Sequence, residues 1–336
     1  MTSNQHPSPI LEVRQLTKWF KVGKGFFSKP QYVKAVEGVS FSLEKSKTVG
    51  VVGESGCGKS TLARLIMQLI PSDSGEILFK GESILGLKGK ALRQVRKNMQ
   101  MIFQDSYASL NPRMRVGNII AEPLIIHGEA SFQKRKERVD EVLEIVGLSK
   151  NSFYKFPHEF SGGQRQRIDI ARALIFNPDV VICDEAVSAL DVSVQSQILN
   201  LLKDLQRQLD LSYIFISHDL SVVRHISDTI MVMYLGKTVE MADKQDLFEE
   251  PLHPYTQALL SAAPRPNPES ISLQIILSGE VPSPMNPPSG CYFRTRCPIA
   301  EDLCKTRVPE LNEVAPGRFV ACHLVSNGNR PRLASP

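Results

Sequence analysis

The sequence has no long run of apolar residues. Its longest stretch without a charged side chain runs from Pro251 to Pro264 and is interrupted by proline. Because a bilayer-spanning helix needs about 18 or more apolar residues, we do not expect the chain to cross a membrane. Residues 1–9 also lack the basic start and apolar core of a secretory signal, so we expect a chain that stays in the cytosol.

Charge of one sign is also scarce. Forty Lys and Arg stand against 35 Asp and Glu, which gives a net charge of +5. This mild excess fits a polyphosphate ligand or a membrane-proximal position and is too weak to indicate nucleic-acid binding. The apolar fraction of 42% and the charged fraction of 22% exclude wholesale disorder, collagen and coiled coil. A chain of 336 residues predicts about two domains, or one large α/β domain with an appendage.

Short apolar segments alternate with segments of helical periodicity. Residues 48–52 and 180–183 are predicted to be buried strands, and residues 61–70, 132–146 and 192–209 are predicted to be helices. This alternation indicates a mostly parallel sheet that is covered on both faces. Further strands are predicted at residues 10–17, 35–43, 77–79, 99–103, 213–217 and 229–234.

The clearest motif follows the strand at residues 48–52. The sequence GESGCGKST matches the pattern GxxxxGK[ST] between a predicted strand and a predicted helix, a context that argues against a chance glycine turn. Glycines let such a loop approach phosphate oxygens, and the backbone N–H groups at the helix start face the negative charge. Lys59 would reach the β and γ phosphates, and the Ser60 hydroxyl would bind Mg²⁺. The predicted nucleotide-binding residues are Gly53, Glu54, Ser55, Gly56, Cys57, Gly58, Lys59, Ser60 and Thr61.

A second apolar run, residues 180–183, ends in the acids Asp184 and Glu185. Two acids are costly in a sheet core unless they emerge at its carboxyl edge, where open α/β sheets bind ligands. We expect Asp184 to hold Mg²⁺ directly or through water, and Glu185 to orient and deprotonate the attacking water. Taken alone, the pair would read as two solvated acids at a strand end, and the upstream phosphate loop makes the catalytic interpretation the better one.

A set of motifs in register carries a family resemblance. Residues 160–167 read FSGGQRQR, and they occur with Gln104, the pair at 184–185, the sequence SALD at 188–191, and His218. In this order and spacing the motifs resemble the nucleotide-binding subunit of ABC transporters over residues 10–265. The resemblance implies an α/β P-loop NTPase fold, the ABC cassette, with a RecA-like core, an antiparallel β subdomain and a helical subdomain at about residues 105–177.

The resemblance also assigns roles to single residues. It implies that Gln104 senses Mg²⁺ and the attacking water, and that His218 contacts the γ-phosphate. Two further motifs would face the γ-phosphate held by a second subunit. They are the family's signature, here Ser161, Gly162, Gly163 and Gln164, and its D-loop residue, here Asp191.

An aromatic ring is expected to stack on the adenine of the nucleotide. Phe20 aligns best with that position in the family, and Trp19 and Tyr32 are further candidates. For each of them, a hydrophobic strand end is an equally good interpretation.

Two departures from the common ABC pattern narrow the resemblance. Ala186-Val187 replaces the usual Pro-Thr, and Phe160 replaces the usual leucine before the signature. Both resemble the second ATPase subunit of oligopeptide and dipeptide importers, as does HPYTQALL at residues 253–260. Neither departure removes a catalytic group, so we expect ATP hydrolysis at this P-loop.

The cysteines are distributed unevenly, and no CxxC pair occurs among them. In the cytosol they are expected to be thiols or metal ligands and not disulfides. A [4Fe–4S] cluster, which takes four thiolates, is the leading interpretation and also the one that the peptide-importer resemblance favours. Structural Zn²⁺, or buried thiols without metal, are the alternatives. The predicted cluster ligands are Cys291, Cys297, Cys304 and Cys322.

The sequence therefore predicts five segments. These are a flexible start at 1–9, the ABC cassette at 10–265, a proline-rich linker at 266–290, a cysteine-bearing oligopeptide-transporter-type extension at 291–325 and a tail at 326–336.

The predicted function is to hydrolyse ATP and so power the uptake of di- and oligopeptides from the cytoplasmic face of a bacterial inner membrane. The resemblance implies a second, homologous ATPase subunit, two transmembrane permease subunits and an extracytoplasmic peptide-binding protein as partners, without nucleic acid. A nickel or other small-solute importer is the nearest alternative. A non-transport ABC ATPase that acts on nucleic acid or ribosomes is the alternative from another class.

Overall fold

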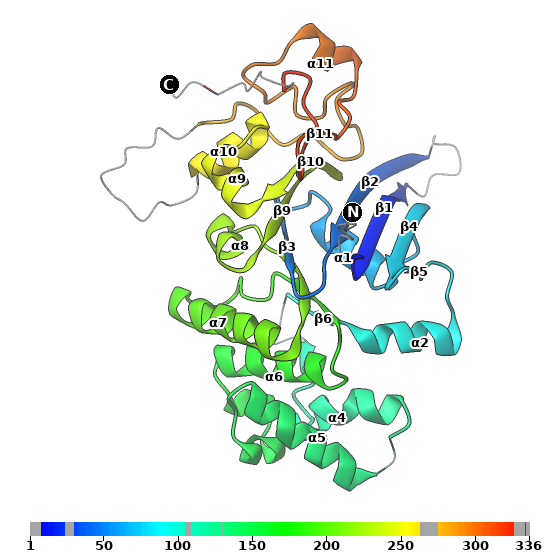
Figure 1. The fold of residues 1–336 in the computed structure, drawn as a ribbon, viewed down its shortest axis with the longest axis vertical. Helices are drawn as coiled ribbons and strands as arrows, with labels where there is room; N and C mark the ends of the chain where they lie inside the picture. Colours follow the sequence, from blue (N-terminus) through cyan, green and yellow to red (C-terminus); the bar gives the residue numbers. More distant parts are fainter. Residues whose placement is uncertain are drawn as a thin grey trace, which may run out of the picture. The chain divides into compact units, whose positions relative to one another are not determined.

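The computed structural model describes residues 8–23, 30–104, 109–129, 131–262, 275–325 and 333. The chain divides into two compact units. The first comprises residues 1–42, 49–85 and 217–336, and the second comprises residues 43–48 and 86–216. In Figure 1 the blue amino-terminal strands and the orange to red carboxyl-terminal elements belong to the first unit. No helix in the described part of the chain has the length and apolarity needed to span a bilayer.

The core of the first unit is a sheet in which two buried strands pair in parallel. Their apolar side chains are buried on both faces, which is typical of central parallel strands. Three further strands continue the sheet with antiparallel pairing, in the order β11-β12-β10-β9-β3. The strands are β3 (Thr48–Val52), β9 (Thr229–Tyr234), β10 (Lys237–Asp243), β11 (Asn312–Ala315) and β12 (Arg318–Val320). The carboxyl-terminal segment thus adds two strands to the sheet that leads into the glycine-rich loop.

A second, antiparallel sheet in the first unit has the strand order β2-β1-β4-β5. Side chains of β1 alternate between buried and exposed at its start, as in a sheet with one covered face. Its strands are β1 (Leu11–Val22), β2 (Gln31–Leu43), β4 (Ser74–Phe79) and β5 (Glu82–Ser83). The helices of this unit are α1 (Lys59–Ile66), α8 (Leu220–Ile226), α9 (Lys244–Glu249), α10 (Pro254–Ala262) and α11 (Asp302–Thr306).

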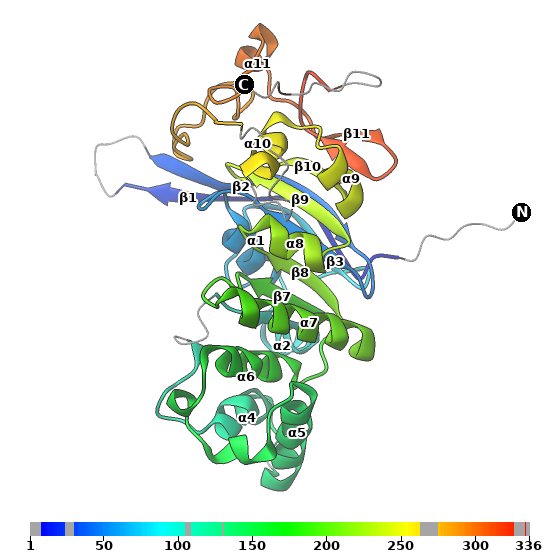
Figure 2. The ribbon, with the colours of Figure 1, turned by 90° about the vertical axis from the view of Figure 1, so that its left-hand side faces the viewer.

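The second unit contains three parallel strands and a group of helices. The strands run in the order β8-β7-β6 and are β6 (Met99–Ile102), β7 (Val180–Asp184) and β8 (Ser212–Ile216). Figure 2 shows α4, α5 and α6 packed beside one another. The helices are α2 (Gly89–Asn98), α4 (Val116–Ile126), α5 (Phe132–Ile145), α6 (Gly162–Leu174) and α7 (Val192–Leu209), with short 3₁₀ turns at Lys150–Tyr154 and Pro157–Glu159.

Most predicted elements are confirmed. The strands at 48–52 and 229–234 and the helix at 192–209 have the predicted bounds. The helix predicted at 61–70 exists as α1, but its bounds were wrong. It starts at Lys59 and ends at Ile66, and it cannot continue because Gln68 adopts a left-handed φ of 51°. The strand β10 and the hairpin β11–β12 were not predicted from the sequence.

The five predicted segments stay a prediction. Three stretches at the predicted boundaries lie outside the described residues: 1–7, 263–274, and all of 326–336 except residue 333. The second of these includes the first nine residues of the predicted linker, 266–274.

Candidate functional site

The glycine-rich loop lies between the end of β3 and the start of α1. Gly53 and Gly58 have φ values of 152° and 109°, which residues other than glycine rarely adopt. A Cβ atom at Gly53 would lie 2.2 Å from the Met233 carbonyl oxygen, and one at Gly58 would lie 2.1 Å from the Ala35 carbonyl oxygen. No side chain caps the start of α1. Backbone N–H groups at a helix start of this kind can bind an anion such as a phosphate.

Lys59 is the cation of this loop. It is 5% exposed, and its Nζ donates hydrogen bonds to the carbonyl oxygens of Gly53 at 2.7 Å and Glu54 at 3.0 Å. A buried ammonium group needs acceptors, and phosphate oxygens are stronger acceptors than these neutral carbonyls. The loop thus holds a positive charge ready for a polyphosphate.

Cys57 lies inside the same loop and is 4% exposed. Burial raises the pKa of its thiol, and the nearby Lys59 only partly opposes this shift. Because the thiol stays protonated at neutral pH, the structure favours the interpretation of Cys57 as a small buried residue over that of a reactive nucleophile.

His218 belongs to the same unit as the loop. It follows Ser217, whose backbone N–H donates to the Val51 carbonyl oxygen at 3.2 Å, so it comes directly after a segment that runs beside β3. His218 is exposed. The next residue, Asp219, caps α8 by accepting a hydrogen bond from the Ser221 N–H at 2.8 Å. The backbone around His218 is therefore fixed, while its ring stays accessible to a ligand.

The second unit brings two of the predicted catalytic residues together. Nε2 of Gln104 donates a hydrogen bond to Oε2 of Glu185 at 2.7 Å. Glu185 has a left-handed φ of 50°, and its backbone N–H donates to the Ile216 carbonyl oxygen at 3.0 Å. A non-glycine residue in this conformation is strained, and such strain is concentrated at functional sites. Asp184, just before it, ends β7 and is 4% exposed.

The predicted signature begins α6 with a reciprocal cap. Oγ of Ser161 accepts a hydrogen bond from the Gln164 N–H, and Oε1 of Gln164 accepts one from the Ser161 N–H at 3.0 Å. This capping box fixes the helix start at which the sequence predicts the anion site. A Cβ atom at Gly163 would lie 2.5 Å from Cγ1 of Val194, so glycine is required there by the packing of α6 against α7.

Asp191 has a structural role that the sequence analysis missed. Its carboxylate caps α7 by accepting hydrogen bonds from the Ser193 hydroxyl at 2.7 Å and the Val194 N–H at 2.9 Å. These two hydrogen bonds lower the pKa of Asp191. An aspartate just before an apolar helical pattern is a general sign of an N-cap, so the signal was present in the sequence.

The three aromatic candidates for the adenine fall into two groups. Trp19 packs on Tyr32 with ring centroids 6.4 Å apart, and Nζ of Lys34 lies 4.8 Å from the Trp19 ring centroid. Phe20 is separate from this pair and lies 5.6 Å from Nζ of Lys18. All three rings are about two-fifths exposed, so the adenine contact of Phe20 stays a prediction.

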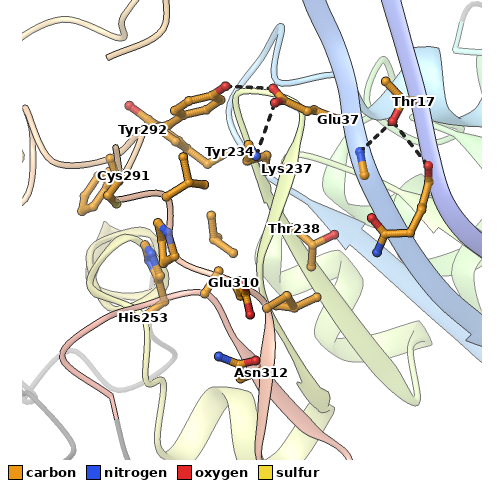
Figure 3. A pocket seen from close by; sticks show the side chains of 18 of the residues that line it. Thr17, Glu37, Tyr234, Lys237, Thr238, His253, Cys291, Tyr292, Glu310 and Asn312 are labelled. Carbon is orange, nitrogen blue, oxygen red and sulfur yellow. Dashed lines mark hydrogen bonds and ion pairs between the residues drawn. The ribbon is translucent and has the colours of Figure 1, made fainter. Parts of the chain in front are cut away.

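A cavity of about 910 Å³ lies between β1, β2 and the carboxyl-terminal segment (Figure 3). At its rim the Tyr292 hydroxyl donates a hydrogen bond to Glu37 at 2.8 Å, and Lys237 forms an ion pair with Glu37 at 3.5 Å. His253 and Cys291 also border it. No residue of the glycine-rich loop lines this cavity, so it is distinct from the predicted phosphate site.

The four carboxyl-terminal cysteines influence one another. Burial, together with the neighbouring cysteines, raises the pKa of Cys297 to about 11 and that of Cys322 to about 12. The Cys291 N–H donates to the Cys304 carbonyl oxygen at 2.9 Å. Across the part of the chain that the structure describes, no group of three or more His, Cys, Asp or Glu residues could hold a metal ion. The predicted cluster therefore stays a prediction.

The sequence itself matches two family models. The model described as "ABC transporter" matches residues 36–188, and the one described as "Oligopeptide/dipeptide transporter, C-terminal region" matches residues 239–304. The Oligopeptide transport ATP-binding protein AppF of Bacillus subtilis (strain 168) is 55% identical over 321 residues, which cover 94% of this chain and 98% of that protein. The chain belongs to the oligopeptide and dipeptide branch of the ABC transporter family. It therefore has the ABC cassette fold and is an ATPase.

Other relatives of this ABC ATPase agree. The Dipeptide transport ATP-binding protein DppF of Haemophilus influenzae is 53% identical over 94% of this chain and 96% of that protein. Among solved structures, a bacterial ABC transporter cassette, MJ0796, matches with a TM-score of 0.61 and 27% identity over 70% of this chain and 98% of that one. The α/β cassette predicted from the motifs is thus confirmed, including the antiparallel sheet that the resemblance implied.

Proposed function

We propose that this ATPase powers the import of di- and oligopeptides across the cytoplasmic membrane of a bacterium, from a peripheral position on its inner face. The observation that carries the proposal is the 55% identity to an oligopeptide transport ATP-binding protein over nearly the whole of both chains. The match of residues 239–304 to the carboxyl-terminal region of oligopeptide and dipeptide transporters supports the same substrate class. Import of nickel is the alternative, and the uptake experiment below distinguishes the two substrates.

The P-loop is proposed to bind the nucleotide. Backbone N–H groups between Gly53 and Gly58 would surround the phosphates, and Lys59 would exchange its two carbonyl acceptors for phosphate oxygens. A phosphate oxygen carries negative charge and a carbonyl oxygen does not, so the exchange adds Coulomb attraction to the ammonium group and favours binding. Ser55, Ser60 and Thr61 complete the loop, and Phe20 would stack on the adenine.

Glu185 is proposed as the general base for the attacking water. Its contact with Gln104 at 2.7 Å fixes the carboxylate by a neutral donor, and a carboxylate fixed in this way can orient a water molecule and accept its proton. His218 would contact the γ-phosphate. Oxygen atoms of Ser60, Gln104 and Asp184 are the hard ligands that Mg²⁺ prefers, and the ion would supply positive charge to the phosphates when bound.

A second ATPase subunit is proposed to complete the site. In this arrangement the α6 start with Ser161, Gly162 and Gly163 faces a nucleotide held by the partner, and the partner's own signature faces this P-loop. The N-terminus of α6 supplies partial positive charge for that purpose. Two permease subunits and an extracytoplasmic peptide-binding protein would complete the importer.

The four cysteines are proposed to hold a [4Fe–4S] cluster with a structural role. Burial raises the pKa of Cys291, Cys297 and Cys322, and backbone N–H groups of Phe293, Ile299 and Leu324 respectively oppose this shift by hydrogen bonds to the sulfur atoms. Hydrogen bonds to sulfur are a usual feature of such clusters. In anaerobically purified protein, iron and sulfide should be found together with broad visible absorption that Cys297→Ser removes and Cys183→Ala, in β7, retains. Zinc without iron would support the alternative.

The function is tested by uptake in cells. Deletion of the gene should abolish the uptake of labelled di- and tripeptides and leave nickel uptake unchanged. Complementation with Glu185→Gln should fail although ATP binding survives, whereas complementation with Asp204→Asn, an exposed acid of α7, should succeed. Loss of nickel uptake with intact peptide uptake would replace peptides by nickel as the substrate.

A further inference from the structure

The carboxyl-terminal segment contacts the P-loop through Arg296. This side chain is 8% exposed, although the residue lies 242 positions away from Glu54 in the sequence. Its Nη1 donates to Oε2 of Glu54 at 2.8 Å, and its Nη2 donates to Oε1 at 3.0 Å. Such a bidentate pair fixes the direction of the carboxylate as well as its charge.

The backbone of Glu54 is held as well. Its N–H donates a hydrogen bond to the hydroxyl of Tyr255 at 2.9 Å. Tyr255 is fully buried and packs against Tyr234 and Phe293, with ring centroids 4.7 and 5.4 Å away. The Arg296 N–H in turn donates to the Phe293 carbonyl oxygen at 3.0 Å. Glu54 is thus held at its main chain and its side chain by residues outside the P-loop motif.

The charge of Glu54 matters because of what the loop binds. The Glu54 carbonyl oxygen accepts a hydrogen bond from Lys59, so this residue is bonded directly to the phosphate-binding lysine. A carboxylate without a counterion in this loop would repel a polyphosphate, and it would also compete for the lysine. Arg296 compensates that charge and fixes the direction of the carboxylate by its two hydrogen bonds.

We propose that Arg296 is a positioning residue for ATP binding, which neutralises and orients Glu54 so that the cysteine-bearing segment sets the nucleotide affinity of the P-loop. The proposal rests on the proposed function only in taking ATP as the ligand of this loop. It gives the carboxyl-terminal segment a role at the nucleotide site, in addition to the two strands it adds to the sheet.

Other contacts would keep the segment docked when Arg296 is removed. Tyr292 donates to Glu37 at 2.8 Å, the Lys34 N–H donates to the Pro284 carbonyl oxygen at 3.3 Å, and β12 pairs with β10. Loss of the Arg296 side chain therefore changes the environment of Glu54 more than it changes the fold. This makes the role of the side chain testable in the full-length protein.

The test measures the dissociation constant of ATP for the purified full chain by calorimetry. Arg296→Ala should weaken binding about tenfold, which equals about 1.4 kcal/mol. Adding Glu54→Gln should restore the affinity to within about threefold of wild type, because the uncompensated charge is gone. The ATP affinity of Arg296→Lys should lie between those of wild type and Arg296→Ala, because lysine keeps the charge but cannot form the bidentate pair. Arg307→Ala, which removes an exposed arginine of the same segment, is the matched control and should bind as wild type.

Turnover in the assembled transporter gives the second readout. Arg296→Ala should raise KM for ATP and leave kcat within about twofold, since ground-state binding is what is lost. Unchanged ATP affinity in Arg296→Ala would overturn the proposal, as would a double variant that binds no better than the single one. Wild-type protein that binds no ATP would instead overturn the proposed function as well.

Discussion

Acid is expected to destabilise the first unit through His253. This residue is 2% exposed at the start of α10, and its Nδ1 accepts a hydrogen bond from the Tyr255 N–H at 3.0 Å. Burial lowers the pKa of His253 from 6.5 to about 3. The folded protein therefore keeps the ring neutral where the unfolded chain would take up a proton. Its contribution to stability is present above pH 6.5 and is lost as the pH falls from 6.5 towards 3.

The size of the effect follows from the shift. Each pH unit below the pKa of histidine in the unfolded chain lowers the free energy of unfolding by about 1.4 kcal/mol. Between pH 7 and pH 5, His253 should therefore lower it by about 2 kcal/mol. His253→Asn removes the titration and retains an acceptor, because an asparagine oxygen can bond the N–H two residues ahead and asparagine is a favourable N-cap. The variant should be less stable at pH 7, since it loses ring packing against Phe293, but its stability should change less with pH.

The assay is urea unfolding at pH 7 and pH 5, followed by the fluorescence of Trp19, the single tryptophan, which lies in the first unit. Carboxylates titrate in both proteins, so their contribution cancels when the two pH differences are subtracted. The remaining difference should be about 2 kcal/mol. Equal pH differences in wild type and variant would refute the reasoning that a neutral His253 is required.

Three further predictions concern the P-loop and the packing of the second unit. Gly163→Ala should destabilise the fold by about 1–3 kcal/mol in thermal melts, and Val194→Ala in the same chain should recover much of this, because the added methyl meets Val194. Lys59→Met should abolish ATP binding in calorimetry while the thermal melt stays near wild type, since Lys59 donates its hydrogen bonds to atoms of the P-loop itself. Asp169→Ala should lower the free energy of unfolding in urea by about 3–5 kcal/mol, because it removes the carboxylate 2.9 Å from the half-buried Arg172. A free energy of unfolding within about 1 kcal/mol of wild type, which is about the error of the assay, would contradict this.

Local patterns predicted the elements whose signal lies within a few residues. The strand β3 and the helix α7 have the predicted bounds, because a buried apolar run and a 3.6-residue period are read directly from the chain. The end of α1 was missed because Gln68 adopts a left-handed φ, a conformation that glutamine rarely has and that the sequence therefore does not predict. The hairpin β11–β12 is short and depends on pairing with β10, which no local pattern indicates.

Contacts between residues far apart in the sequence could not be predicted from local patterns. Gln104 and Glu185 lie 81 residues apart, and only the family resemblance placed both near one water molecule. The pair of Arg296 and Glu54 was not predicted, because a charged pair separated by 242 residues leaves no periodicity in the sequence. Asp191 was assigned to the nucleotide alone, and its cap of α7 shows that one carboxylate can carry a structural role at the same position.

The measurement that tests the account most directly is the ATPase rate of the purified chain as a function of its concentration, with and without the second ATPase subunit. Strictly monomeric protein should release almost no phosphate, and the rate should rise when the second subunit supplies its signature to this P-loop. Hydrolysis at the full rate by a monomer at every concentration would contradict the proposal that the site is shared between two chains.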